Sequence, residues 1–354
     1  MAKRVLIAMS GGIDSSVAAM LLLEQGYELV GVTFRTFDSI KESCLAKEKG
    51  CCSVENIMEA KHLAERLGFE HHILDYRQIF RDTVIRNFTS EYMCGRTPNP
   101  CVLCNSHIKW GELMRAADEF GCEKIATGHY ARIAEHNGHL YLRVAADTTK
   151  DQTYFLWMLT EENLRRTVFP LGDLQKTEVR QLAAAHGFKK LSEKRESQEI
   201  CFIPDNDYRT FLASEGLIVE KGVYVDADGN RLGEHDGYCN YTIGQRKGLG
   251  IALGKPCYVT RIDAATNTVQ LGSHDDLLTN RVDADQIRVR DTQWLKNDPE
   301  VEVRIRYRSK AVHARLQIDG THLTAFTYEP VWGVTPGQSL VVYKEGMVVA
   351  GGII

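Results

Sequence analysis

A short apolar run that leads into a glycine turn and then an apolar helix constrains this chain more than any other feature. Residues 5–9 (VLIAM) predict a buried strand, and residues 10–16 (SGGIDSS) follow directly. The apolar residues from Val17 to Leu23 then predict a helix, with Asp14 on the loop before it. Adjacent glycines let a backbone turn present its N–H groups to an anion, and the positive end of the next helix points to the same place. The segment therefore predicts a phosphate-binding strand–turn–helix unit.

The same seven residues resemble SGGxDS, the pyrophosphate loop of the ATP pyrophosphatases. They do not fit the Walker pattern, which requires a lysine after its last glycine. The resemblance implies that ATP binds here, and Asp14 is a candidate ligand for a Mg²⁺ ion that bridges phosphate oxygens. A glycine-rich turn without a ligand is the alternative.

Length and composition indicate a globular protein of two or three domains. The chain has 354 residues, of which 44% are apolar and 25% charged, and a net charge of −4. No apolar stretch approaches the roughly 18 to 20 residues that a membrane helix needs, and the first strand is followed at once by polar residues, unlike a signal peptide. We therefore expect a soluble, cytoplasmic protein that does not contact a membrane. Any nucleic-acid-binding surface on it must be local.

Residues 1–203 alternate apolar strands with helical segments. Strands are expected at 29–34, 72–75 and 124–127, and an amphipathic helix at 53–67. This alternation predicts an α/β fold with a doubly wound parallel sheet, in which ligands bind at the carboxyl ends of strands. Ser10 to Asp14, Phe34 and Gly128-His129 all lie at such ends, which predicts one shared site.

The texture of the sequence changes after Pro204. Residues 208–273 are rich in glycine and turn pairs and predict a small central β-rich domain, and short alternating runs in 280–354 predict a carboxyl-terminal β-barrel. Within 301–310, period-two spacing predicts a strand with Arg304, Arg306, Arg308 and Lys310 on one face. This face is either an ordinary solvated one or a contact for a phosphate backbone.

Ten cysteines in a cytoplasmic protein suggest reactive or metal-binding thiols. Cys101 and Cys104 form a C-x-x-C after Asn99-Pro100, and Cys201 lies far along the chain in residues 197–202 (SQEICF). Taken alone, the C-x-x-C is compatible with a redox pair, half of a zinc site or part of an iron–sulfur site.

Eight motifs in a fixed order resemble the MnmA-type tRNA-specific 2-thiouridylases over nearly the whole chain. They are SGGIDS (10–15), TPNP leading to Cys104-Asn105 (97–105), TGHYAR (127–132), KDQTYFL (150–156), SQEICF (197–202), YTIGQRKGLG (241–250), RYR (306–308) and TPGQ (335–338).

The resemblance implies a tRNA-uridine 2-sulfurtransferase that replaces O2 of the wobble uridine in tRNAs for lysine, glutamate and glutamine. Its fold would be an ATP-pyrophosphatase domain, a small central domain and a carboxyl-terminal β-barrel that contacts tRNA. ATP would adenylate the uridine in the anticodon loop. Sulfur from a cysteine desulfurase or a sulfur-relay carrier would arrive as a persulfide on Cys201. Cys104 would be the catalytic nucleophile, which would either attack that persulfide to free sulfide or carry the transfer itself. A Cys104–Cys201 disulfide would then close, and it must be reduced before the next turnover.

Further site residues are implied by the same motifs. The expected ATP-binding residues are Ala8, Met9, Ser10, Gly11, Gly12, Ile13, Asp14, Ser15, Phe34 and Gly128. The expected tRNA contacts are Asn99, Pro100 and Cys101 near the target base, together with His129, Lys150, Asp151, Gln152, Arg306, Tyr307 and Gln338.

One residue departs from the commoner family pattern, which has aspartate where this chain has Cys101. The change allows the hypothesis that Cys101, Cys104 and Cys201 hold a [4Fe–4S] cluster with one iron open for hydrosulfide. The alternative is that a thiol, which is a weaker acid, simply replaces the carboxylate.

Two other functions remain open from the sequence. Another ATP pyrophosphatase that acts on a small molecule would explain the loop but not the distant thiols. An RNA-binding protein without turnover would leave intact Asp14 and both glycines unexplained. The charged, aperiodic residues 38–52 predict a mobile loop.

Overall fold

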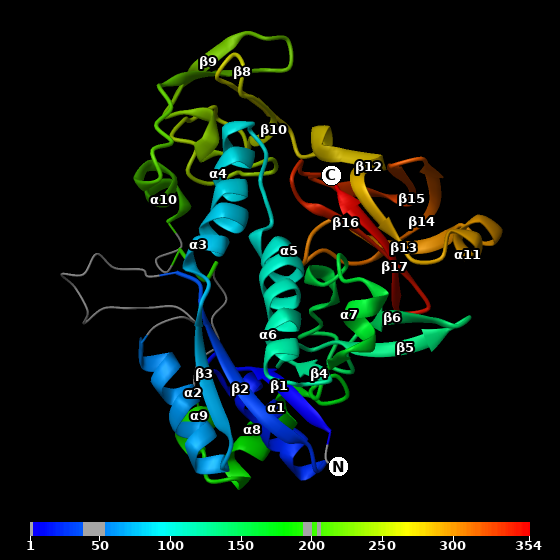
Figure 1. The fold of residues 1–354 in the computed structure, drawn as a ribbon. Helices are drawn as coiled ribbons and strands as arrows, with labels where there is room; N and C mark the ends of the chain where they lie inside the picture. The colour runs from blue at the N-terminus through cyan, green and yellow to red at the C-terminus, as the bar shows by residue number, and fades with distance from the viewer. Residues whose placement is uncertain (1–2, 38–53, 194–199, 204–206) are drawn as a thin grey trace. The chain divides into compact units, whose positions relative to one another are not determined.

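The computed structural model describes residues 3–37, 54–193, 200–203 and 207–354 (Figure 1). The mobile loop predicted at 38–52 lies outside the described residues. The chain forms two compact units: Met1–Val84, Cys101–Asn206 and Gly346–Val348 make the first, and Ile85–Pro100, Asp207–Glu345 and Val349–Ile354 make the second. The division into three domains, with boundaries near 203, 208, 273 and 280, stays a prediction.

A parallel sheet forms the centre of the first unit, as the sequence predicts. Its strand order is β3-β2-β1-β4-β7, and every neighbouring pair is parallel. The strands are β1 (Arg4–Ala8), β2 (Glu28–Arg35), β3 (Glu70–Asp75), β4 (Lys124–Ala126) and β7 (Thr167–Val168). Because β1 lies between β2 and β4, the residues that follow these three strands meet at one edge of the sheet.

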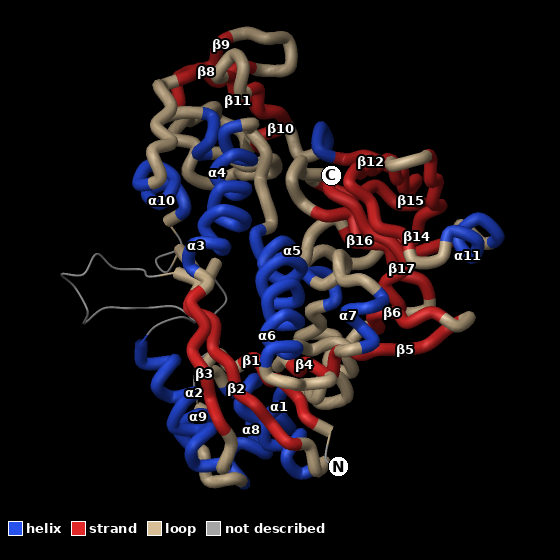
Figure 2. Tube along the Cα trace, viewed as in Figure 1, coloured by secondary structure: helices blue, strands red, loops and turns tan. Residues whose placement is uncertain are grey.

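Helices pack on this sheet by burying apolar faces. Val5, Ile7 and Met9 share a core with Val17 of α1 (Ile13–Glu24) and Val179 of α8 (Lys176–Ala185). Helix α2 (Val54–Leu67) adds Ala60 and Leu63 to the same core, and α6 (Leu113–Glu119) contacts β1 and β4 (Figure 2). The fully buried Val, Leu and Ile side chains of β1 explain why this strand reads as a continuous apolar run.

The other elements of the first unit are short. They are α3 (Arg77–Phe80), α5 (Pro100–Leu103), a π-helical segment Cys104–Glu112, β5 (Arg132–His136), β6 (His139–Arg143), α7 (Glu161–Arg165) and α9 (Lys189–Ser192). Strands β5 and β6 form an antiparallel hairpin, and Met347 and Val348 pair with β6.

The second unit contains a small mixed sheet beside two helices. The sheet order is β10-β11-β8-β9, from β8 (Gly222–Val225), β9 (Arg231–His235), β10 (Tyr258–Asp263) and β11 (Thr268–Gly272). Helix α4 (Arg86–Met93) packs on α10 (Tyr208–Ser214), where Tyr92 stacks on Tyr208 and Phe88 meets Phe211 edge-on. The β-rich texture of 208–273 is thereby confirmed.

A closed barrel of six antiparallel strands follows, as predicted. Its order is β12-β15-β14-β13-β16-β17, and β12 pairs with β17 to close it. The strands are β12 (Leu278–Val289), β13 (Glu300–Arg304), β14 (Val312–Asp319), β15 (His322–Trp332), β16 (Ser339–Lys344) and β17 (Met347–Ile353).

The basic strand predicted at 301–310 is only half correct. Strand β13 ends at Arg304, and a turn follows in which the Ser309 N–H donates to the Arg306 carbonyl at 3.1 Å. The four cations therefore do not share one strand face.

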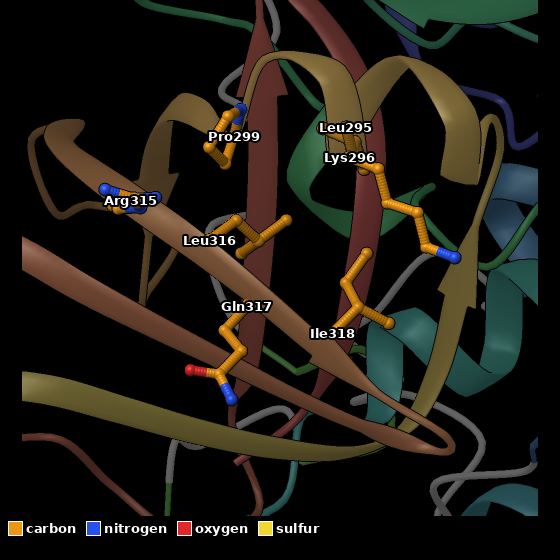
Figure 3. A pocket seen from close by; sticks show the side chains of 7 residues that line it. All are labelled: Leu295, Lys296, Pro299, Arg315, Leu316, Gln317 and Ile318. Atoms are coloured by element: carbon orange, nitrogen blue, oxygen red, sulfur yellow. The ribbon is translucent and has the colours of Figure 1, made fainter.

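A hollow of about 250 Å³ lies between α11 (Thr292–Asn297) and β14 (Figure 3). Leu295 and Lys296 line it from the helix, and Leu316 and Ile318 line it from the strand. No residue that the sequence assigns to a site lines this hollow. In the part of the chain that the structure describes, no helix is long and apolar enough to cross a membrane.

Candidate active site

The turn between β1 and α1 leaves the helix N-terminus without a side-chain cap. Gly12 is the N-cap residue, and no side chain caps the helix there. The Ser15 and Ser16 hydroxyls donate to the Gly12 carbonyl at 3.2 and 2.9 Å, and the Ser10 N–H donates to Ser15 Oγ at 3.2 Å. The loop is thus closed by its own serines, while the first N–H groups of α1 remain available for an anion. Because α1 begins at Ile13, the prediction that Asp14 lies on the loop is wrong.

Two glycines are required by close backbone approaches around this loop. Gly11 has φ +67°, and a Cβ there would lie 2.2 Å from the Asn56 carbonyl oxygen of α2. A Cβ on Gly128 would lie 2.7 Å from the carbonyl carbon of Asp14 and from the Ser15 nitrogen. The residues after β4 therefore pack directly on the first turn of α1, which confirms the predicted meeting of strand ends.

Asp14 is held by two side chains from other parts of the first unit. Lys176 Nζ lies 2.7 and 2.9 Å from its two carboxylate oxygens, and the Tyr130 hydroxyl donates to Oδ1 at 2.8 Å. The Lys176 side chain is only 9% exposed, against 32% for that of Asp14. Asp14 is therefore the outer member of the pair and remains within reach of a cation from solvent.

The carbonyl of Met9, just before the loop, is fixed by a short hydrogen-bond chain. Thr33 Oγ1 donates to this carbonyl at 2.9 Å and accepts from His71 Nε2 at 2.8 Å. Burial lowers the pKa of His71 to about 4. At neutral pH the ring is therefore neutral, with its proton on Nε2. Nearby, the half-buried Phe34 is the last residue but one of β2, and its ring meets that of Tyr76 edge-on.

His129 is a buried neutral imidazole at the end of β4. Its Nδ1 lies 2.9 Å from Thr127 Oγ1, and its Nε2 lies 3.4 Å from Lys109 Nζ. Burial, aided by the Lys109 ammonium, holds the pKa of His129 well below its usual value. Nε2 therefore accepts from Lys109, and Nδ1–H donates to Thr127.

Cys101 and Cys104 lie one turn apart on a helix that begins at Pro100. Proline suits this first helical position because it lacks the N–H that would be unpaired there. A π-helical segment starts at Cys104 and continues to Glu112. Such segments are rare in proteins as a whole, and those that occur are often found at functional sites. Cys101 is exposed and Cys104 is half-buried.

Cys201 occupies a tight turn in the same unit. The Ile203 N–H donates to the Ile200 carbonyl at 2.9 Å and closes the turn. The adjacent Phe202 is buried, with its ring centroid 5.6 Å from that of Phe80 and 6.2 Å from that of Phe37. Cys201 itself is half-buried, so Phe202 anchors a turn whose thiol reaches solvent.

In the second unit, three of the sequence motifs are joined by hydrogen bonds. Gln338 Nε2 donates to the carbonyls of Thr97 and Pro98 at 2.8 and 3.3 Å. Thr97 Oγ1 donates to Thr242 Oγ1 at 3.2 Å, and the Thr97 N–H donates to the Pro336 carbonyl at 2.8 Å. The segment that leads into Asn99-Pro100 is therefore held on both sides.

The Arg306 side chain forms hydrogen bonds with loops of the same second unit. Its guanidinium donates to the carbonyls of Ile243 and Gly333 at 3.0 and 2.7 Å, and also to the Thr335 hydroxyl. Arg306 and the neighbouring Tyr307 are half-buried. In this arrangement Arg306 joins the loops that carry Ile243 and Thr335.

Known proteins match this chain over nearly its whole length. Residues 3–205 match the family described as "tRNA methyl transferase HUP domain", 209–273 its "PRC-barrel domain", and 284–354 the "Aminomethyltransferase beta-barrel domain". A "tRNA-specific 2-thiouridylase MnmA" of Amoebophilus asiaticus is 49% identical over 99% of this chain and 95% of its own length. Proteins of that name from Cytophaga hutchinsonii and Salinibacter ruber are 46% and 47% identical, each over 99% of this chain and over 97% and 94% of their own lengths. The chain belongs to the tRNA-specific 2-thiouridylase family.

Cys101, which the sequence analysis singled out, stands in an environment that favours its neutral form. Cys101 is exposed as a residue, yet desolvation of its thiol by the surrounding protein raises the pKa of that thiol, and the nearby Lys109 ammonium opposes this only in part. At pH 7 the Cys101 side chain is therefore a neutral thiol and not an anion.

The three-thiol cluster hypothesis finds no support in the geometry. Among the described residues, which include Cys101, Cys104 and Cys201, no group of three or more His, Cys, Asp or Glu side chains is placed to hold a metal ion. The thiols present therefore do not fit a [4Fe–4S] cluster, and we derive no step through one.

The KDQ motif expected to touch tRNA is largely turned inward in this 2-thiouridylase. Asp151 is buried and accepts hydrogen bonds from the Ala145 N–H at 3.1 Å and the Thr153 hydroxyl at 2.8 Å. Gln152 Oε1 accepts from the Tyr130 N–H at 2.9 Å, and Lys150 is half-buried. The roles of these three residues in tRNA binding stay predictions.

Sequence reasoning missed the partners of Asp14. Tyr130 lies inside a motif that sequence analysis recognised, directly after His129, and that position was its only signal. Lys176 carried none, because a single lysine at a helix start is common and only the packing of α8 on α1 brings it to Asp14.

Proposed function

We propose that this chain thiolates O2 of the wobble uridine in tRNAs for lysine, glutamate and glutamine, at the expense of ATP. Its similarity along the full length to proteins named for tRNA 2-thiolation supports this reaction. The observation that carries it is that one compact unit holds both an uncapped helix N-terminus behind SGGxDS and the two thiols Cys104 and Cys201. Methyl transfer, which the family descriptions name, would leave these thiols without a role.

Adenylation solves the first chemical difficulty, which is that a carbonyl oxygen is a poor leaving group. Uridine O2 attacks the α-phosphorus of ATP, pyrophosphate departs, and AMP becomes the new leaving group. The open N–H groups of α1 and the Ser10 hydroxyl bind phosphate oxygens. Asp14 would hold a Mg²⁺ ion, which would neutralise part of the negative charge of the triphosphate. Ala8, Met9, Phe34 and Gly128 line the nucleotide at the edge of the sheet.

Sulfur transfer then requires two thiols. The terminal sulfur of a Cys201 persulfide attacks C2 of the uridine and displaces AMP. The Cys104 thiolate next attacks the Cys201 sulfur, which breaks the S–S bond to the uridine sulfur and leaves 2-thiouridine and a Cys104–Cys201 disulfide. An external thiol reductant restores both thiols, and a cysteine desulfurase or a sulfur carrier reloads Cys201.

The target base must leave the anticodon loop to reach these groups, and single-stranded loops allow this at low cost. Asn99, Pro100 and Cys101 then lie near the base. His129, Lys150, Asp151, Gln152, Arg306, Tyr307 and Gln338 complete the proposed tRNA contacts. We expect the reaction in the cytoplasm, where both tRNA and reductant are present.

Release of pyrophosphate from ATP tests this proposal against its two alternatives. The protein is incubated with ATP and Mg²⁺, with and without an unmodified tRNA for lysine, and pyrophosphate is quantified. Release that depends on tRNA supports the thiolation reaction. Release without tRNA indicates a small-molecule ligase, and no release under either condition indicates an RNA-binding protein without turnover.

The [4Fe–4S] route that the sequence left open, and that the arrangement of the described thiols does not fit, can also be tested by experiment. Iron and sulfide analysis after anaerobic reconstitution, with an EPR spectrum, tests it directly. A stoichiometric cluster would replace the persulfide step, whereas its absence after reconstitution would leave the persulfide route.

A further inference from the structure

The Lys176 side chain that pairs with Asp14 lies in the protein interior. The lysine side chain is 9% exposed, and its Nζ contacts both oxygens of the Asp14 carboxylate. The ammonium also lies 5.6 Å from the centre of the Tyr130 ring, whose hydroxyl donates to the same carboxylate. Removing a lysine ammonium from water costs several kcal/mol, so a lysine in this position needs a compensating anion.

Hydrogen bonds at the start of α8 hold the backbone of Lys176 in place. Lys176 is the first residue of α8, and its N–H donates to Asp147 Oδ2 at 3.0 Å. Gln175 and Glu178 form a capping box that sets the start of the helix. Because α8 packs along α1, which carries Asp14, both members of the pair stand on rigid elements that share one core.

The Asp14 carboxylate and the phosphates proposed to bind beside it are both negatively charged, and Lys176 can offset their repulsion. Asp14 lies in the first turn of α1, beside the N–H groups proposed to bind the triphosphate, and a carboxylate there repels phosphate oxygens. A cation behind the carboxylate offsets this repulsion. An ionised carboxylate offers about four lone-pair positions, so Asp14 remains able to bind Mg²⁺ on its exposed side while Lys176 and Tyr130 hold it from within.

We propose that Lys176 is a positioning residue of the nucleotide site, which orients the Asp14 carboxylate for the Mg²⁺ of MgATP and compensates its charge. This inference rests on the proposed function, since it requires that ATP binds at the loop. Lys176 contacts Asp14 and not the reacting atoms. Its contribution therefore lies in nucleotide and Mg²⁺ affinity and not in tRNA affinity.

The test compares the binding of MgATP, presented as its non-hydrolysable α,β-methylene analogue, by calorimetry. Lys176→Met keeps most of the side-chain volume and removes the charge. We expect its dissociation constant for the analogue to rise about tenfold or more, the loss of one charge-assisted contact. Its affinity for tRNA should not change, and Lys176→Arg should recover part of the loss. Lys189→Met, at an exposed lysine of α9 in the same unit, is the matched control and should bind like wild type.

A double-mutant cycle with Asp14→Asn shows whether Lys176 acts through Asp14. We expect the double variant to bind the analogue no more weakly than Asp14→Asn alone. The double variant also removes both charges of the pair, so it provides a folded protein if the unpaired Asp14 charge in Lys176→Met is destabilising. Wild-type affinity in Lys176→Met, or additive losses in the cycle, would overturn the proposal. Wild-type protein that binds no analogue would instead refute the nucleotide site itself.

Discussion

At the scale of single residues, the three thiols near the proposed chemistry differ in what holds them. Cys104 stands at the start of a π-helical segment, and Cys201 stands on a turn that Phe202 anchors in the core. Cys101 is exposed, and the surrounding protein raises its thiol pKa. This contrast predicts different consequences for the same substitution at the three positions.

Replacing each cysteine by serine tests that contrast. Cys104→Ser and Cys201→Ser should abolish 2-thiouridine formation and leave tRNA binding unchanged, because serine neither carries a persulfide nor attacks one. Cys101→Ser should keep thiolation within a fewfold of wild type, since one neutral hydrogen-bonding group replaces another. The measurements are nucleoside mass spectrometry and filter binding of tRNA. Equal loss in all three variants would favour a three-thiol cluster.

Gly128 predicts a second effect at this scale. In Gly128→Ala the new methyl group meets backbone atoms of Asp14 and Ser15, which cannot rotate away, so the loop must shift. We expect a destabilisation of roughly 1–3 kcal/mol and a higher KM for ATP. Gly111→Ala is the matched control, because the nearest atom to its Cβ is 3.8 Å away. Unchanged ATP kinetics in Gly128→Ala would contradict the close approach.

At the scale of elements, His71 on strand β3 makes the stability of the fold depend on pH. Its folded-state pKa of about 4 lies below the ordinary value of 6.5, so the unfolded chain binds more protons between these values. The free energy of unfolding is therefore unaffected by the titration of this histidine above pH 6.5. It falls as the pH drops from 6.5 toward 4, by at most about 1.4 kcal/mol per pH unit. Urea unfolding of His71→Gln should show a shallower decline of the free energy of unfolding with falling pH than wild type. Parallel curves for His71→Gln and wild type would refute this dependence on pH.

Arg306 provides a second prediction for an element, the loop junction of the second unit. Arg306→Ala removes the donor for two carbonyls and a hydroxyl, so we expect the free energy of unfolding to fall by about 2 kcal/mol or more. Arg308→Ala, at an exposed position of the same turn, should leave it unchanged. Thermal melts and tRNA binding are measured together. An unchanged Tm in Arg306→Ala would contradict the structural role, and weaker tRNA binding at that unchanged Tm would leave Arg306 as a tRNA contact alone.

At the scale of the whole molecule, periodicity predicted what depends on local pattern. Strands near 5–9, 29–34, 72–75 and 124–127 and the β-barrel are confirmed, because buried parallel strands and alternating strands leave clear apolar patterns. The strand predicted at 301–310 is too long, because the period-two spacing of the sequence continues through a turn that begins after Arg304. The contacts of Lys176 and Asp151 could not be predicted, because they depend on segments distant in sequence.

Nucleoside mass spectrometry on a treated tRNA transcript tests the central claim most directly. An unmodified tRNA with a wobble uridine is incubated anaerobically with iron-free protein, ATP, Mg²⁺, a cysteine desulfurase and cysteine, and Cys201→Ser is run in parallel. The account predicts 2-thiouridine with wild-type protein and none with the variant. Product that forms only after iron–sulfur reconstitution, or an absence of product under both conditions, would contradict it.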